Sequence, residues 1–324
     1  MPRHFLAALL AFLLTAAQAF AAETKVYPLP EGAGPHDTAP APDGKVWYTA
    51  QGAGALGTLD PTTGEVRQVP LGEDSAPHGV IPGPDGAAWI TDGGQNAIVR
   101  YDPRTGAIKR WLLPAETGFA NLNTATFDRK GNLWFTGQSG IYGSLEPATG
   151  RLRVWKDPDG AGPYGITTTP DGRVFYASLA GSHIAEIDTA SGSKRRVDPP
   201  NPGQGARRVW ADSQGDVWVS EWNAGRLARY TPASGAWKNW RVPGSDRPHA
   251  YAVYVDERGT VWLSDWGTNT VMSFDPATER FTPYPGSAPD ANVRQLSGRP
   301  GEILVPESGL DRIRIIRYGG APAG

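Results

Sequence analysis

Short apolar segments alternate with Gly- and Pro-containing turns along almost the whole chain. In seven places, a Gly in a turn is followed three residues later by a large apolar residue. The pairs are Gly44/Trp47, Gly86/Trp89, Gly131/Trp134, Gly172/Phe175, Gly215/Trp218, Gly259/Trp262 and Gly301/Leu304. The glycines are 41 to 45 residues apart. A period in the low forties, with strand-forming residues between turns, is typical of a β-propeller with one four-stranded blade per repeat.

The second repeat shows how one blade is built. In "SAPHGVIPGPDGAAWITDGGQNAIVRYDPRTGAIKRWLLP", four short strands are predicted at "HGVIPG", "AAWIT", "AIVRYD" and "AIKRWLLP". The first six repeats cover about 33–71, 74–114, 117–158, 160–200, 203–244 and 245–286. The seventh ends before a fourth strand, and "KVYPLP" at 25–30 resembles the missing strand. We therefore expect an all-β, seven-bladed propeller whose ring is closed by the N-terminal strand in the last blade.

Composition narrows the classes of partner. The 324 residues include 31 Lys and Arg against 33 Asp and Glu, which gives no basic surface for nucleic acid or an anionic membrane. There is no cysteine, so disulfides, a catalytic thiol and thiolate metal sites are excluded.

The N-terminus has the pattern of a secretory signal. A short basic region at Arg3 and His4 precedes an apolar stretch from Phe5 to Ala16, and small residues follow. We predict that residues 1–22 are a cleaved signal peptide and that 23–324 form a single domain. The mature protein is then expected in the periplasm or secreted, as a monomer with no membrane span.

Two sets of residues are predicted at the mouth of the central channel. The first lies eleven residues before each repeat aromatic: His36, His78, Asn123, Tyr164, Arg207, Tyr251 and Val293. We name this set the mouth ring; His249 lies two residues before its sixth member. The second set follows the aromatic by three and includes Asp92, Glu221, Asp265 and Glu307. Histidines and carboxylates that converge in this way suit a divalent cation or acid–base chemistry. Blade-to-blade hydrogen bonds and solvated loop carboxylates are the alternative.

Arginine and tryptophan side chains add a third group of candidates. Arg207, Arg208, Arg247 and Arg294 lie near the same mouth in sequence. Clustered guanidinium groups favour a carboxylate or phosphate ligand, although ion pairs with Glu221, Asp265 and Glu307 would also account for them. Trp222 and Trp266 follow the acidic positions and suit either aromatic walls for a ring-bearing ligand or packing between blades. A small-molecule ligand at the channel mouth is therefore predicted.

Several repeat phrases carry a resemblance to a known family. "GPYGITTTPDGRVFYA", "SAPHGVIPGPDGAAWIT", "RPHAYAVYVDERGTVWLSDWGTN" and the opening "YPLPEGAGPHDT" resemble repeats of the virginiamycin B lyase (streptogramin lyase) family. The likeness extends over the whole mature chain. Members of that family are seven-bladed propellers that linearise type B streptogramins, a form of antibiotic resistance. They cleave the ester by elimination with the help of magnesium.

The resemblance implies roles for particular residues. His249 matches the histidine of the family's sixth-blade "PHA" motif, and Glu307 lies in the segment that supplies a last-blade glutamate. A carbon–oxygen lyase would then use His249 or His78 as the base, with Mg2+ held by Glu307, Asp265 and Glu221. The last blade reads "DANVRQLSG" where the family has a "PHG" motif with the principal histidine. Two alternatives therefore stay open: a non-catalytic propeller that binds a ligand or a protein, and a metal-dependent lactonase built on Glu221, Asp265, Glu307 and Asn123.

Overall fold

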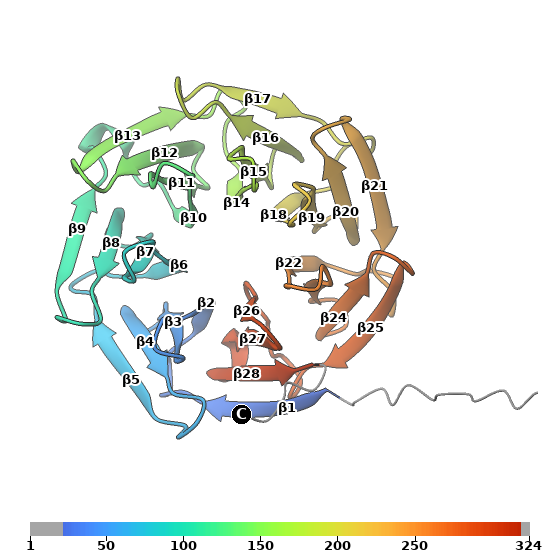
Figure 1. Ribbon diagram of the computed structural model, residues 1–324, viewed down its shortest axis with the longest axis horizontal. Helices are drawn as coiled ribbons and strands as arrows, with labels where there is room; N and C mark the ends of the chain where they lie inside the picture. The colour runs from blue at the N-terminus through green and yellow to red at the C-terminus, as the bar shows by residue number, and fades with distance from the viewer. Residues whose placement is uncertain (1–21, 319–324) are drawn as a thin grey trace, which may run out of the picture.

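The computed structural model describes residues 22–318, which form seven four-stranded antiparallel sheets around a central channel (Figure 1). Blade 1 contains β2 (Pro35–Pro40), β3 (Val46–Ala50), β4 (Ala55–Leu59) and β5 (Val66–Pro70); blade 2 contains β6 (Pro77–Pro82), β7 (Ala88–Asp92), β8 (Ala97–Tyr101) and β9 (Ile108–Leu112). Blade 3 contains β10 (Leu122–Phe127), β11 (Leu133–Gly137), β12 (Ile141–Glu146) and β13 (Arg151–Lys156); blade 4 contains β14 (Pro163–Thr168), β15 (Val174–Ser178), β16 (His183–Ile187) and β17 (Lys194–Val197).

The other blades continue this order. Blade 5 contains β18 (Ala206–Ala211), β19 (Val217–Glu221), β20 (Arg226–Thr231) and β21 (Ala236–Arg241); blade 6 contains β22 (Ala250–Val255), β23 (Val261–Asp265), β24 (Thr270–Asp275) and β25 (Arg280–Pro285). Blade 7 contains β26 (Ser297–Arg299), β27 (Glu302–Glu307), β28 (Arg312–Arg317) and β1 (Glu23–Pro28). Two 3-10 turns, η1 (Ala115–Thr117) and η2 (Ser308–Leu310), lie between strands. The seven-bladed propeller predicted from the repeat is confirmed.

The N-terminal strand closes the ring as predicted. β1 pairs antiparallel with β28 and becomes the outermost strand of blade 7, which joins the two ends of the chain in one sheet. Tyr27 is buried, and its hydroxyl donates to the carbonyl oxygen of Pro61 in blade 1 at 2.7 Å. β1 therefore completes the sheet of blade 7 and links that blade to blade 1.

The recurring Gly and Trp have separate structural causes. All seven repeat glycines have φ between 75° and 95°, a left-handed conformation that residues with a Cβ rarely adopt. The repeat Trp side chains are buried between blades, and four of the indole N–H groups donate to an Asp in the preceding turn. The repeat phrase thus encodes a turn and a core anchor, and both are needed before any site exists.

A hydroxyl group two residues after the repeat aromatic joins neighbouring blades. Thr49 Oγ1 accepts from the backbone N–H of Asp37 at 2.9 Å and donates to the carbonyl of His78 in the next blade at 2.8 Å. Equivalent pairs of bonds are made by Thr91, Thr136, Ser220 and Ser264. Ala177 and Pro306 occupy this position in blades 4 and 7. These hydroxyls fix the backbone of mouth-ring residues, so the blade junctions also position the site.

The predicted signal peptide, residues 1–22, lies almost entirely outside the described residues. Within residues 22–318, no helix has the length and apolar character needed to cross a membrane.

We predict that the closing strand stabilises the whole ring. Tyr27→Ala should lower the free energy of unfolding by about 3 to 5 kcal/mol, because it removes a buried ring and its hydrogen bond. Thr24→Ala, on an exposed position of the same strand, should change it by less than about 0.5 kcal/mol. Urea unfolding followed by circular dichroism measures both. Equal effects of the two substitutions would contradict a closing role.

Candidate functional site

Each inner strand is distorted near its start, and this distortion aims side chains into the channel. The pairing of β2 with β3 shifts register between Pro35 and Thr38, and the inner strands of blades 2–6 shift at equivalent places. A bulge of this kind places two consecutive residues opposite one partner and redirects their side chains. Here the redirected residues are the mouth ring and the residues that follow it.

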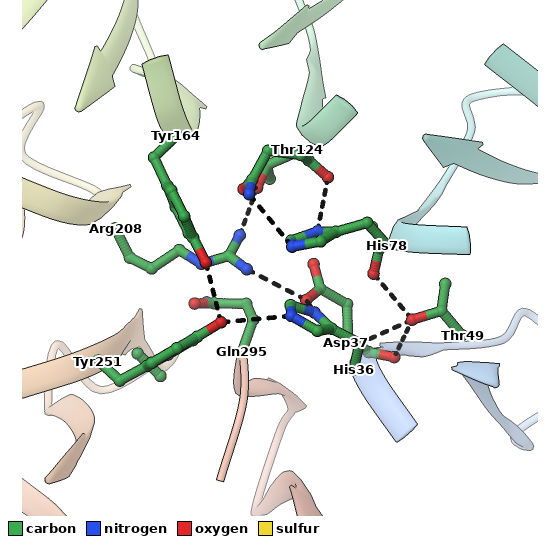
Figure 2. Close-up of polar contacts among 12 residues, drawn as sticks. His36, Asp37, Thr49, His78, Thr124, Tyr164, Arg208, Tyr251 and Gln295 are labelled. Carbon is green, nitrogen blue, oxygen red and sulfur yellow. Dashed lines mark hydrogen bonds and ion pairs between the residues drawn. The ribbon is translucent and has the colours of Figure 1, made fainter. Parts of the chain in front are cut away.

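Three mouth-ring side chains and Asp37 form a chain of hydrogen bonds at the channel axis (Figure 2). Tyr164 donates to the Tyr251 hydroxyl across 3.0 Å, and Tyr251 donates to His36 Nε2 across 3.3 Å. The His36 Nδ1–H donates to Asp37 Oδ1 at 2.8 Å. His78 packs its ring 3.7 Å from that of His36, measured between centroids. These groups, together with Arg208, form what we name the channel plug.

Arg208 crosses the channel beneath this chain. Its guanidinium, which extends from blade 5, donates to the Thr124 hydroxyl in blade 3 and pairs with Asp37 in blade 1 at 3.3 Å. The Arg208 residue is 1% exposed. The inner-strand position that corresponds to Arg208 is glycine in blades 2 and 4. A Cβ added to Gly165 would lie 2.7 Å from the Arg208 Cα. The glycine in blade 4 therefore allows the backbone of blade 5 to approach closely at Arg208.

The plug histidines are held neutral. Burial, followed by the charges of Arg208, Arg294 and Arg207, lowers the pKa of His36 well below its usual value. Burial likewise lowers the pKa of His78, whose Nδ1–H donates to the Asn123 carbonyl at 2.9 Å. Its Nε2 accepts from the Asn123 amide at 3.1 Å. Both ring nitrogens of each plug histidine are therefore occupied.

The two tyrosines differ in acidity. Burial alone would raise the pKa of Tyr251, but Arg208, Arg207, Arg294 and the hydrogen bond from Tyr164 outweigh it and lower the pKa to about 8. Burial and the neighbouring Tyr251 raise the pKa of Tyr164 to about 12. Tyr251 is thus the plug tyrosine that ionises more easily.

Above the plug, arginine and aromatic side chains form the accessible surface of the mouth. The Arg207 guanidinium lies 4.0 Å from the centroid of the Tyr251 ring and 4.4 Å from that of Trp222. The Arg294 guanidinium lies 4.8 Å from the Trp266 centroid, and Trp266 stacks on Tyr251 at 5.2 Å with an interplanar angle of 7°. Cation–π contacts hold the two guanidinium groups in place. Arg207 also donates to the Tyr164 hydroxyl at 3.1 Å, while the Nε–H of each arginine has no acceptor within residues 22–318.

His249 lies at the edge of the same surface. Its ring stacks on Trp222 at 4.8 Å, and its Nδ1–H donates to the Trp222 carbonyl at 3.2 Å. Its Nε2 makes no hydrogen bond with any residue between 22 and 318 and is half-buried at the mouth. His249 is therefore the one described mouth histidine with a ring nitrogen available to a ligand.

The predicted carboxylates do not come together. Both oxygens of Asp265 accept bonds from the backbone of its own blade, from His249, Gly267 and Thr268. Glu307 accepts from Ser287 and pairs with the buried Arg314 at 3.1 Å. Each of these carboxylates fixes a loop of its own blade.

Glu221 is the exception among the carboxylates. It is buried, its Oε2 has no partner within the described chain, and burial raises its pKa to about 7 against the opposing charge of Arg226. Its carboxyl group therefore titrates near neutral pH.

These residues do not fit a magnesium site. In residues 22–318, one set of three His, Asp or Glu side chains has its ligand atoms within 4.8 Å of one another, namely His36, Asp37 and His78. Magnesium prefers oxygen ligands, and here two are imidazole nitrogens while the Asp37 carboxylate is already paired with Arg208. Glu307, Asp265 and Glu221 form no such group. Magnesium use stays a prediction of the resemblance, and no step below passes through it.

The comparison with protein families agrees with this architecture. The model of the virginiamycin B lyase family matches residues 15–250, more than two thirds of the chain. The chain belongs to the virginiamycin B lyase family. No curated protein sequence matches it. The family resemblance seen in the repeat phrases is thereby confirmed.

Solved structures of this family have the same fold. Virginiamycin B lyase from Staphylococcus aureus superposes with a TM-score of 0.84 at 21% identity, over 92% of this chain and 100% of that chain. A streptogramin B lyase gives 0.84 at 19% identity, over 92% and 98%. YCF48 bound to the D1 peptide gives 0.70 at 12% identity, over 93% and 96%. Likenesses at these identities establish the fold alone.

The candidate residues now divide into three groups. The plug contains His36, His78, Tyr164 and Tyr251. The accessible mouth contains Arg207, Trp222, His249, Trp266 and Arg294. The third group contains the carboxylates, of which Asp265 and Glu307 each fix a loop and Glu221 is buried. Sequence reasoning missed Asp37. The signal was present, because "PHD" in blade 1 has an aspartate where "PHG" in blade 2 has a glycine.

We predict that one tyrosine ionises near pH 8, about two units below the ordinary value. An ultraviolet difference titration should show this transition in the native protein and lose it in Tyr251→Phe. Tyr164→Phe should move it upward, because the phenolate then loses a donated hydrogen bond. Tyr284→Phe, on the outer strand of blade 6, is the control and should leave it in place. A native protein without any transition below pH 9 would refute the assignment.

Proposed function

We propose that the mouth binds a small anionic molecule with a flat, ring-bearing body, and that this chain is a ligand-binding member of its family. The observation that carries the proposal is the pair Arg207 and Arg294. Neither guanidinium has a carboxylate partner within residues 22–318, and the Nε–H group of each is buried without an acceptor. Two half-buried cations without counter-ions favour a bound carboxylate or phosphate.

The aromatic side chains support the flat, ring-bearing body of the proposed ligand. Trp222 and Trp266 are half-buried and cross at 75°, with ring centroids 5.6 Å apart. Their buried edges pack on the plug, so the exposed parts of the two indoles are rigid. Flat apolar groups stack well on such surfaces, and aromatic residues lose little conformational entropy on binding.

The state of the histidines supports binding over turnover. His36 and His78 are buried with both nitrogens occupied, and they join blade 1 to blade 6 and blade 2 to blade 3. The last blade has Asn292, Val293 and Arg294 where a base would be needed, and none of these side chains accepts a proton at neutral pH.

The apolar N-terminal stretch further leads us to infer export, so the ligand would be met in the periplasm or outside the cell.

We predict that phenylacetate binds at least about tenfold more tightly than the neutral phenylacetamide, because only the carboxylate accepts charge-assisted hydrogen bonds. Isothermal titration calorimetry measures both. Arg207→Gln and Arg294→Gln should each weaken phenylacetate by about tenfold and leave phenylacetamide nearly unchanged. Arg67→Gln removes the same charge from an exposed position on blade 1 and should have no effect. Equal affinities for acid and amide would overturn the proposal.

The affinity for phenylacetate should fall as the pH rises through about 8. Below that value Tyr251 is neutral, and above it the phenolate adds negative charge beside the two mouth arginines. A decrease of about fivefold between pH 7 and pH 9 corresponds to ~1 kcal/mol of repulsion. Tyr251→Phe should be insensitive to pH over this range. A pH dependence retained by that variant would point to another group.

A second candidate is the carbon–oxygen lyase reaction of the family, favoured by the available Nε2 of His249. In that case His249 would remove the proton that begins ester elimination. The lactonase alternative has no such support, since Asn123 is engaged with His78 and the carboxylates lie in separate loops.

Mature protein incubated with a type B streptogramin and magnesium should leave the substrate intact, as judged by liquid chromatography with mass spectrometry. A shifted product of unchanged mass would establish elimination and overturn the binding proposal. The same reaction with His249→Gln and with chelator would then test the base and the metal. A product heavier by one water would indicate hydrolysis.

A further inference from the structure

A second cavity lies on the other side of the channel plug. Its volume is about 410 Å³, and it is lined by the C-terminal halves of the inner strands of the blades, including Pro40, Pro82 and Ala211. The mouth ring lies at the opposite, N-terminal ends of the same strands. Asp37 and Arg208 of the plug also line the cavity, so they separate it from the mouth. This volume is within the range typical of small-molecule sites.

The wall of this cavity is mainly apolar. Its apolar side chains come from six blades: Val80, Ile81, Phe127, Ile166, Val209, Trp210, Tyr254 and Leu296. The hydroxyls between them are already paired with each other, Thr126 with Thr168 at 3.1 Å and Thr38 with Ser297 at 3.0 Å. Trp210 and Tyr254 meet edge to face with centroids 4.9 Å apart. The wall therefore favours a ligand with an aromatic or aliphatic body.

Two polar atoms of the lining have no partner. The Gln295 amide nitrogen donates to the carbonyls of Val253 and Leu296, both at 2.9 Å, which fixes the side chain and leaves its Oε1 buried without a donor. The Arg208 Nε–H is likewise buried without an acceptor. The backbones of Gln295 and Asp37 form an isolated β-bridge, and both residues line the cavity with Arg208 at its inner end; Figure 2 labels all three side chains. Unpaired buried polar groups are costly, and a ligand that pairs with them recovers that cost.

We propose that this second cavity binds a compact, uncharged aromatic alcohol or phenol. The apolar wall takes the ring system, and the hydroxyl lies at the inner end, where it can donate to Gln295 Oε1 or accept from Arg208 Nε–H. The proposed ligand is uncharged because the charge of Arg208 is already balanced by Asp37. This site is independent of the anion site at the mouth, from which the plug separates it.

The test uses 1-naphthol and its methyl ether, 1-methoxynaphthalene, which has the same rings without the O–H donor. Isothermal titration calorimetry on the mature protein should show 1-naphthol binding at least about tenfold more tightly. Gln295→Met, which removes the acceptor, should bring the two affinities within about twofold. Absence of binding by both molecules, or equal affinity in the unmodified protein, overturns the proposal without any variant.

Three variants place the binding in this cavity. Thr126→Trp fills it from a half-buried position and should weaken 1-naphthol by more than about twentyfold. Thr282→Trp, on an exposed position of the outer strand of blade 6, is the matched control and should have no effect. Arg207→Gln should also leave 1-naphthol unchanged while it weakens phenylacetate. Loss of 1-naphthol binding in Arg207→Gln but not in Thr126→Trp would assign it to the mouth and overturn the proposal. Circular dichroism establishes that each variant is folded.

Discussion

The Arg208 guanidinium and its bonds to Asp37 and Thr124 lie where three blades come together at the centre of the ring. A buried arginine is tolerated only when its charge is balanced and its donors find acceptors. This requirement accounts for the aspartate after His36. Burial, together with the charge of Arg208, lowers the pKa of both plug histidines. Removing the arginine would leave the Asp37 carboxylate buried without a counter-charge, which is a large penalty in the interior.

The plug also divides the electrostatic environment of the channel. On the mouth side, Arg207 and Arg294 add positive charge that no described carboxylate neutralises, while the ion pair of Arg208 with Asp37 leaves the other side close to neutral. One central channel can therefore offer two chemically different surfaces. Both consist of the same inner strands, and their character differs because the strand starts carry long polar side chains and the strand ends carry apolar ones.

Sequence alone was sufficient for the fold because each repeat encodes a turn and a buried anchor that do not depend on distant residues. The mouth ring could be predicted for the same reason: equivalent positions in successive repeats lie at equivalent places in successive blades. The roles of the side chains could not. Asp265 and Glu307 were expected to hold a cation, but their partners come from loops whose geometry the period does not specify. Arg208 was noted near the mouth, yet its reach across the channel to Asp37 joins residues of different blades, which the repeat period does not specify.

The blade-junction hydroxyls have a further consequence for how the ring moves. The junction of blade 4 with blade 5 and that of blade 7 with blade 1 lack this hydroxyl, because Ala177 and Pro306 replace it. These two junctions divide the ring into one arc of four blades, 1 to 4, and another of three, 5 to 7. Arg208 belongs to the smaller arc and both of its side-chain partners belong to the larger one, so the guanidinium links the two arcs across the channel. Opening of the ring at these two junctions is therefore opposed at its centre by Arg208 together with the Tyr164–Tyr251–His36 hydrogen bonds, which also join the two arcs.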